Sequence, residues 1–220
     1  MDSLNVGLVG MGNVGSGTLQ ILLENKDQLA QKLGIPVRVV AVCSRTIHEK
    51  TLPAGSEGIL RTTNWQDVVA NPDIHVVAEL IGGSNPACQL IESALAAGKA
   101  VVTANKELMA KEGLRLWQKA SEAERPLAME ASAAGGIPIH SVLREGISGD
   151  RIEAMAGILN GTCNFILTEM DKAGRGFQDV LAEAQRLGYA EADPSADVDG
   201  YDARSKLAIL ATIAFGCGVP

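Results

Sequence analysis

The sequence lacks the features that mark membrane proteins and disulfide-rich proteins. No uninterrupted apolar run approaches the roughly 18–20 residues of a membrane-spanning helix, and the first residues lead into a strand pattern instead of a signal peptide. The cysteines are few and widely separated, and no two form a CxxC pair, which argues against a disulfide framework or a zinc site. They are Cys43, Cys88, Cys163 and Cys217. These absences predict a cytoplasmic protein with reduced thiols.

Basic residues are also scarce. The chain of 220 residues has 19 Lys and Arg against 26 Asp and Glu, which gives a formal net charge of −7. A nucleic-acid-binding protein needs a basic surface against phosphates, so the charge argues against that class. Glycine and proline show no period, and 46% of the residues are hydrophobic, which together indicate a globular chain of one large or two small domains.

Short apolar runs alternate with helix-like segments along the first 131 residues. The runs predict strands over residues 5–10, 37–43, 74–80, 99–103 and 126–130. Helical spacing predicts helices over residues 18–33, 67–70, 87–97 and 107–124. This alternation predicts an α/β fold, a Rossmann-type doubly wound parallel sheet, for residues 1–131.

The pattern changes after residue 131. A small, flexible SAAGGIP segment predicts a crossover into a second domain, residues 132–220. Here the pattern predicts one strand over residues 151–159 and helices over residues 138–145, 163–172, 177–187 and 202–215. One strand cannot form a sheet, so we expect an incomplete α+β domain. Further chain, or a second subunit in a homodimer, would complete it.

A glycine-rich turn follows the first predicted strand. In GMGNVG, residues 10–15, Gly10 permits a tight turn, Gly12 lets a pyrophosphate approach the backbone, and Gly15 allows close packing of helix and strand. Asn13 and Val14 complete the turn at a helix N-terminus, which favours anions. The motif at this first strand–helix junction predicts a dinucleotide cofactor.

The end of the second predicted strand indicates which dinucleotide binds. An acidic residue there would suit the ribose of NAD, but the sequence has Ser44 and Arg45. A hydroxyl and a guanidinium suit a 2′-phosphate, so NADP(H) is favoured and NAD(H) stays possible. The alternative is an ordinary solvated arginine.

An acidic stretch marks the second domain. Five carboxylates and no cation lie between Glu191 and Asp202, and a calcium loop does not fit because Val198 stands where glycine is required. Asp202 and Lys206 are four residues apart on a predicted helix and share one face. A lysine placed in this way can protonate an alkoxide, and Glu191 can hold a substrate ammonium. A solvated acidic loop is the alternative interpretation.

These residues carry a resemblance to a known family. GILNGTCNFIL (157–167) and GYAEADPSADVDGYDARSKLAIL (188–210) closely resemble homoserine dehydrogenase, as do TANKE (103–107) and EASAAGGIPI (130–139). The resemblance implies reduction of L-aspartate 4-semialdehyde to L-homoserine with NADPH or NADH, on the route to threonine, isoleucine and methionine. It also implies a longer catalytic region than this chain, so we expect the chain alone to be incomplete.

The resemblance further implies roles for individual residues. Lys206 would be the general acid, and Asp202 would be its partner and also contact the substrate. Glu191 would bind the substrate amino group, and Lys106 would be a second active-site lysine. The implied cofactor contacts add Thr103, Lys106, Gly161 and Gly188. A monovalent cation, sodium or potassium, would be held largely by main-chain carbonyls of Glu130, Ala133, Gly135 and Ile137.

Two other functions remain open from the residues themselves. Cys163, with His140 as a partner, can be interpreted as the nucleophile of an acylating aldehyde dehydrogenase. A small buried cysteine is the alternative. A module that only senses NADP is the second possibility, but it would not need a proton donor such as Lys206.

Overall fold

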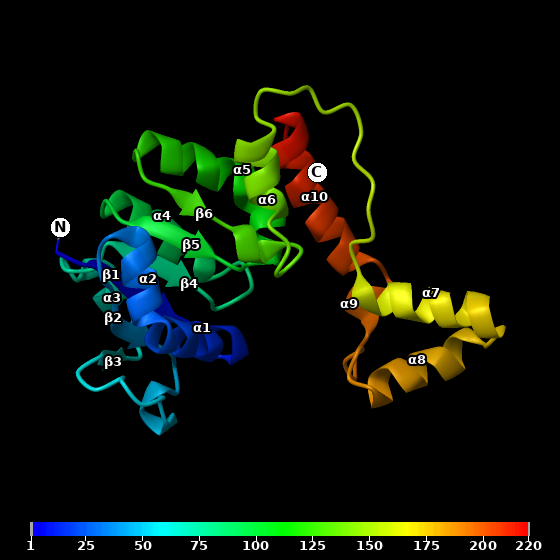
Figure 1. The fold of residues 1–220 in the computed structure, drawn as a ribbon, viewed down its shortest axis with the longest axis horizontal. Coiled ribbons are helices and arrows are strands. Elements are labelled where there is room, and N and C mark those ends of the chain that lie inside the picture. Colours follow the sequence, from blue (N-terminus) through cyan, green and yellow to red (C-terminus); the bar gives the residue numbers. More distant parts are fainter. Residues whose placement is uncertain (1, 220) are drawn as a thin grey trace. The chain divides into compact units, whose positions relative to one another are not determined.

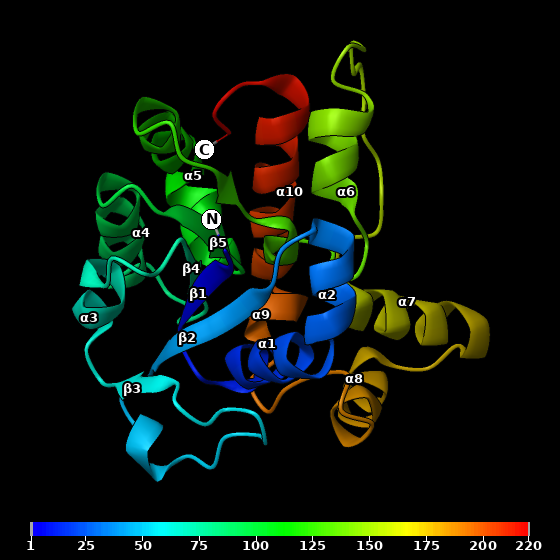
Figure 2. The same ribbon diagram turned by 60° about the vertical axis from the view of Figure 1, so that its left-hand side comes forward.

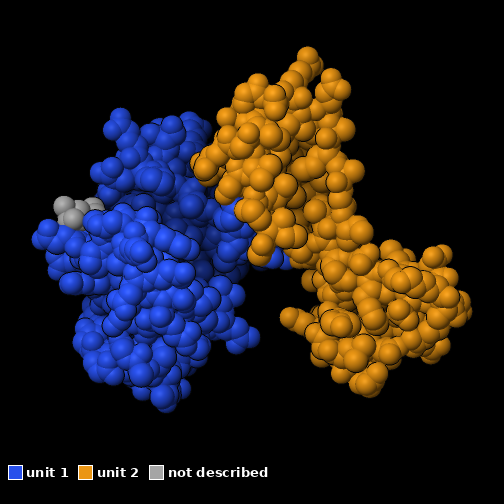
Figure 3. Space-filling view, viewed as in Figure 1, with its two compact units in different colours: residues 1–135 blue, residues 136–220 orange. Residues whose placement is uncertain are grey.

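The computed structural model describes residues 2–219 of the chain. It divides between Gly135 and Gly136 into two compact units, which Figure 3 colours separately. This division lies slightly beyond residue 131, the boundary derived from the sequence. Unit 1 and unit 2 are described separately below.

Unit 1 is built on one parallel sheet. Its strands are β1 (Leu4–Val9), β2 (Val37–Cys43), β3 (Leu60–Thr62), β4 (Val76–Glu79), β5 (Ala100–Thr103) and β6 (Leu127–Ala128). They pair in parallel in the order β3-β2-β1-β4-β5-β6, which confirms the predicted Rossmann-type fold. The strand order reverses between β1 and β4, so a crevice is expected at the carboxyl ends of these two strands.

Helices cover both faces of this sheet. They are α1 (Asn13–Glu24), α2 (Lys26–Leu33), α3 (Trp65–Ala70), α4 (Ala87–Ala96) and α5 (Lys106–Glu122), with short 3₁₀ turns η1 (Ile47–Glu49) and η2 (Glu130–Ser132). Figure 2 shows α1 and α2 on one side of β1 and β2, and α3 and α4 on the other. The parallel strands are therefore shielded on both faces, as their apolar sequences require.

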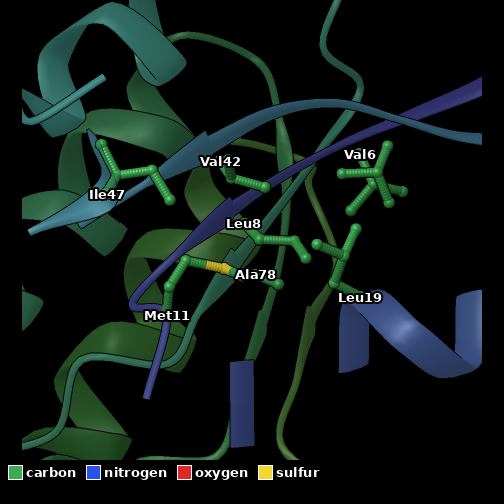
Figure 4. Packing of buried hydrophobic residues seen from close by; sticks show 8 residues of the cluster. Val6, Leu8, Met11, Leu19, Val42, Ile47 and Ala78 are labelled. Carbon is green, nitrogen blue, oxygen red and sulfur yellow. The ribbon is translucent and has the colours of Figure 1, made fainter. Parts of the chain in front are cut away.

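A hydrophobic cluster fixes α1 against the sheet. Leu8 of β1 and Leu19 of α1 are fully buried, and Val42 of β2 packs with them (Figure 4). Burying one such leucine contributes roughly 1.5–3 kcal/mol. Because the cluster includes Met11, it also anchors the glycine-rich turn that joins β1 to α1.

Two details of unit 1 differ from the sequence prediction. The predicted helix over residues 18–33 begins earlier, at Asn13, and is split into α1 and α2 at Asn25. The Asn25 side chain donates to the carbonyl oxygen of Ile21 at 2.9 Å, and such local bonds compete with helix continuation. The strand β3 was not predicted, because three residues are too few to show a period.

Unit 2 is helical in the described residues. It contains α6 (Ile139–Ser141), the π-helical η3 (Val142–Gly146), α7 (Gly161–Ala173), α8 (Phe177–Arg186), α9 (Ser195–Val198) and α10 (Tyr201–Phe215). Figure 1 shows α7 and α8 as a hairpin, and Ile166, Val180 and Ala184 form a core between them. The Asn160 side chain caps α7 by accepting a hydrogen bond from the Cys163 N–H.

The predicted strand over residues 151–159 is wrong. These residues join η3 to α7 without regular structure. A strand requires a hydrogen-bonding neighbour, and unit 2 contains no other strand among its described residues. No helix within residues 2–219 is long and apolar enough to cross a membrane.

Candidate functional site

The glycine-rich turn has the close contacts that its sequence predicts. Gly10 has φ +106°, and a Cβ there would lie 2.3 Å from the carbonyl oxygen of Leu80. A Cβ on Gly15 would lie 1.8 Å from the carbonyl oxygen of Gly10. A Cβ on Gly12 would meet no atom within 4 Å, so open space lies above the start of α1. The backbone therefore excludes a side chain at Gly10 and Gly15, and it leaves room for a ligand beside Gly12.

The turn opens onto a cavity of about 460 Å³ at the carboxyl ends of the strands. Gly10 and Gly12 line it from the β1–α1 junction, Ser44 and Arg45 from the end of β2, and Gly82 from the loop after β4. Asn13 and Val14 lie on the exposed first turn of α1. The structure thus brings the glycine turn and the Ser44–Arg45 pair together at the switch point, where α/β folds bind their ligands.

The charge of this cavity suits an anion. Arg45 is exposed and contributes a guanidinium. Cys43 also lines the cavity, but burial and the nearby Asp67 raise the pKa of its thiol to about 11, so this sulfur is neutral near pH 7. Thr63 and Trp65 lie in the wall as well. Sequence reasoning missed them because they follow the short strand β3.

The predicted residues Thr103 and Lys106 lie at the next strand end. Lys106 is the first residue of α5, half-buried, and Asn105 caps this helix with its side chain. Thr103, the other predicted cofactor contact, is fully buried, and its hydroxyl donates to Glu79 at 2.6 Å. Glu79, also fully buried, was missed, although an acidic residue inside an apolar strand run was a visible signal.

A second cavity, of about 560 Å³, lies within unit 2. It is lined by the start of α7, the segment around Gly188, and the first two turns of α10. The predicted residues Gly161, Gly188, Asp202 and Lys206 all contribute to it. Asn160 and Thr162 of the predicted Asn160–Thr162 turn also line it, and so does Asp197, which the site prediction did not contain.

A hydrogen-bonded network organises the polar wall of this second cavity. Lys206 Nζ lies 2.7 Å from Asp202 Oδ2 and 2.8 Å from the carbonyl oxygen of Leu159. The side chain of Lys206 is 21% exposed and that of Asp202 only 9%. The lysine is held by two acceptors yet keeps a surface toward the cavity, as a proton donor requires.

Asn160 connects two carboxylates in this network. Its Nδ2 donates to Asp202 Oδ2 at 2.9 Å and to Asp197 Oδ1 at 2.7 Å. Asp202 Oδ2 therefore accepts from Asn160 and from Lys206, which fixes the orientation of the carboxylate.

The remaining predicted residues of unit 2 have different surroundings. Glu191 is exposed and is not among the described residues that line the cavity. Cys163 is partly buried, and its thiol donates to the Asp197 carbonyl oxygen at 3.2 Å. Burial, Asp197 and Asp202 raise the pKa of Cys163, which disfavours the thiolate. His140 is buried in α6.

The residues implied in a cation site follow the end of the sheet. Glu130 is half-buried in η2, Ala133 is buried, and Gly135 and Ile137 are exposed on either side of the division between the units. Within residues 2–219, no group of three or more His, Cys, Asp or Glu side chains is placed to hold a metal ion. A cation here would therefore depend on main-chain carbonyl oxygens.

Comparison with known sequences assigns both units to one family. The family described as homoserine dehydrogenase, NAD binding domain, matches residues 10–130, and the family described as homoserine dehydrogenase matches residues 138–220. Homoserine dehydrogenase of Pseudomonas aeruginosa is 49% identical over 216 residues, which cover 98% of this chain and 49% of the relative. The chain spans about half the length of the curated relatives it matches.

Solved structures agree with the sequence comparison. The crystal structure of a homoserine dehydrogenase from Thiobacillus denitrificans superposes with a TM-score of 0.88 at 49% identity, covering 99% of this chain and 50% of that one. A hyperthermophilic archaeal homoserine dehydrogenase in complex with NADPH gives a TM-score of 0.84 at 27% identity, covering 98% and 71%. With the two family matches, these likenesses show that the chain belongs to the homoserine dehydrogenase family.

Proposed function

We propose that the full-length protein catalyses the NADPH-dependent reduction of L-aspartate 4-semialdehyde to L-homoserine and the reverse oxidation. The observation that carries this proposal is the placement of Lys206, held by Asp202 and the Leu159 carbonyl in the cavity wall. The family membership supplies the substrate class. The product would serve threonine, isoleucine and methionine biosynthesis in the cytoplasm.

The cavity of unit 1 is the proposed cofactor site. Gly10, Gly12 and Gly15 shape the turn for a pyrophosphate, and the start of α1 supplies the positive end of a helix. Arg45, beside Ser44, would pair with a 2′-phosphate, so NADP(H) is preferred over NAD(H). A relative with bound NADPH supports this assignment.

The proposed chemistry divides between the cofactor and Lys206. When bound, the dinucleotide would supply the hydride that reduces the aldehyde carbon. As the C–H bond forms, the carbonyl oxygen gains negative charge, and the Lys206 ammonium transfers a proton to it, which gives the alcohol. Asp202 holds the lysine in orientation through the 2.7 Å contact. Lys106 would position the substrate carboxylate, and Glu191 the substrate amino group.

Two further parts of the proposal come from the family. Sodium or potassium would bind the carbonyl oxygens around Glu130, Ala133, Gly135 and Ile137 and order this small-residue segment. A homodimer formed through unit 2 would provide a strand partner for residues 151–159, which have none within residues 2–219.

The two alternative functions have weaker support. An acylating aldehyde dehydrogenase needs a reactive thiolate, and the environment of Cys163 raises the pKa of this thiol. A protein that only senses NADP would not need a lysine such as Lys206, which is held by Asp202 and the Leu159 carbonyl oxygen in the wall of a cavity.

A turnover assay on the full-length protein tests the proposed function. With L-homoserine and NADP as substrates, we expect steady formation of NADPH, measured by its absorbance. Acyl-phosphate- or coenzyme A-dependent turnover, with none on homoserine, would favour the Cys163 alternative. Binding of NADPH without any turnover would favour the sensor.

A further inference from the structure

Glu79 is a fully buried carboxylate whose partners lie at the edge of the cofactor cavity. It ends β4, next to the switch point of the sheet. Its Oε1 accepts hydrogen bonds from the main-chain N–H groups of Ile81 and Gly82, at 2.8 and 3.3 Å. Its Oε2 accepts one from the Thr103 hydroxyl at 2.6 Å. All three donors are neutral groups, and within residues 2–219 no Lys, Arg or His forms an ion pair with this buried carboxyl group.

The same network continues through Asn105. The main-chain N–H of Asn105 donates to Thr103 Oγ1 at 3.0 Å, and its Nδ2 donates to the Gly83 carbonyl oxygen at 2.6 Å. Its Oδ1 accepts from the Leu108 N–H at the start of α5. The loop of residues 81–83 is therefore held at one end by Glu79 and at the other by Asn105.

This loop is a wall of the proposed cofactor cavity. Ile81 and Gly82 line it together with Gly10 and Gly12 of the glycine-rich turn. The loop directly follows Leu80. The carbonyl oxygen of Leu80 would lie only 2.3 Å from a Cβ built on Gly10, so the chain here is in close contact with the glycine-rich turn. A shift of the loop would therefore change the shape of the cavity and press on the turn.

We propose that Glu79 is a positioning residue for binding of the nicotinamide dinucleotide. It fixes the loop of residues 81–83 and, through Thr103 and Asn105, the start of α5 that carries Lys106. This inference rests on the proposed function, because it takes the cavity to be the cofactor site. A buried carboxylate is costly unless fully hydrogen-bonded, and an apolar side chain would fill the core at less cost. Positioning of the loop and of the start of α5 is therefore the reason we infer for a buried glutamate at residue 79.

The test replaces Glu79 by its isosteric amide. In Glu79→Gln, an NH₂ donor faces either the Thr103 hydroxyl or the N–H groups of the loop, so one end of the network loses its acceptor. We expect the Kd for NADPH to rise about tenfold or more, measured by fluorescence titration of the full-length protein. The matched control is Glu92→Gln, which removes a charge from the α4–α5 ion pairs with Arg115 and Lys119 and should leave this Kd unchanged.

A second variant separates positioning from stability. Thr103→Val removes the hydroxyl link while keeping the shape of a fully buried side chain. It should weaken NADPH binding in the same direction, non-additively with Glu79→Gln, because the two residues act in one network. If Glu79→Gln does not fold, Thr103→Val alone carries the test.

The outcomes distinguish this inference from the proposed function. A wild-type protein that does not bind NADPH contradicts the proposed function. A wild-type protein that binds NADPH, with variants of unchanged Kd, overturns only the role of Glu79. Lower melting temperatures with unchanged Kd would show that the network is purely structural and would equally overturn the inference.

Discussion

Asp202 and Lys206 lie one helical turn apart on α10, with Oδ2 and Nζ separated by 2.7 Å in the wall of a cavity. Ion pairs at this spacing are common on exposed helices, where they contribute only about 0.2–0.5 kcal/mol. This pair differs because Asp202 is buried, Asn160 binds the same carboxylate oxygen, and the Leu159 carbonyl accepts from the same lysine. The pair is therefore a part of a built site and not a surface contact.

Replacing Asp202 by asparagine should lower kcat in the full-length protein. The amide keeps the shape but removes the negative charge that holds the Lys206 ammonium. The effect should be non-additive with Lys206→Ala, because the two side chains act as a unit. The control is Asp199→Asn, the same change at an exposed position in the same acidic stretch. Additive losses in kcat would contradict a shared role.

Replacing Arg45 by alanine should reduce affinity for NADP(H) selectively. A charge-assisted hydrogen bond to the 2′-phosphate contributes roughly 1.5–3 kcal/mol, so binding should weaken about 10- to 100-fold. NAD(H) lacks that phosphate, and its Kd should change little. Arg38→Ala, an exposed arginine near the other end of β2, serves as the control. Equal losses for both cofactors would show that Arg45 has another role.

A monovalent cation should raise the melting temperature of the full-length protein. The segment after β6 is rich in alanine and glycine and has little side-chain mass to fix its own path, so carbonyl coordination would order it. The measurement compares sodium and potassium with a bulky organic cation at equal ionic strength. Identical melting curves in all three salts would count against the site.

Replacing Cys163 by alanine should leave homoserine oxidation nearly unchanged. Burial, Asp197 and Asp202 raise the pKa of this thiol, so a thiolate is disfavoured at neutral pH. Alkylation by iodoacetamide should accordingly be slower at Cys163 than at the exposed Cys217. Loss of all turnover in Cys163→Ala, with normal folding, would instead support the acylating mechanism.

Local sequence patterns predicted the sheet, the glycine turn and the Asp202–Lys206 pair. Each depends on residues close together in the chain: short apolar runs for the strands, a spacing of four for a helix face, and the six residues of the glycine motif. What the patterns missed depends on contacts between distant residues. Asn160 meets Asp197 and Asp202 from 37 and 42 residues away, and Glu79 meets Thr103 from 24 residues away.

The wrong strand over residues 151–159 has the same cause. Its apolar residues are compatible with a strand, but pairing depends on a neighbouring strand that no local pattern reveals. The break between α1 and α2 at Asn25 was missed although its cause is local. A residue able to end a helix was visible in the sequence, but whether its side chain bonds to Ile21 depended on the conformation adopted.

The measurement that tests the account most directly is kcat for homoserine oxidation in Lys206→Ala and Lys106→Ala, made in the full-length protein. Removing a general acid typically costs about 10²–10⁴-fold in rate. Lys206→Ala should therefore lower kcat by that order with nearly unchanged NADPH affinity, while Lys106→Ala should act mainly on KM for homoserine. Near-normal kcat in Lys206→Ala, together with its loss in Lys106→Ala, would contradict the assignment of Lys206 as the proton donor.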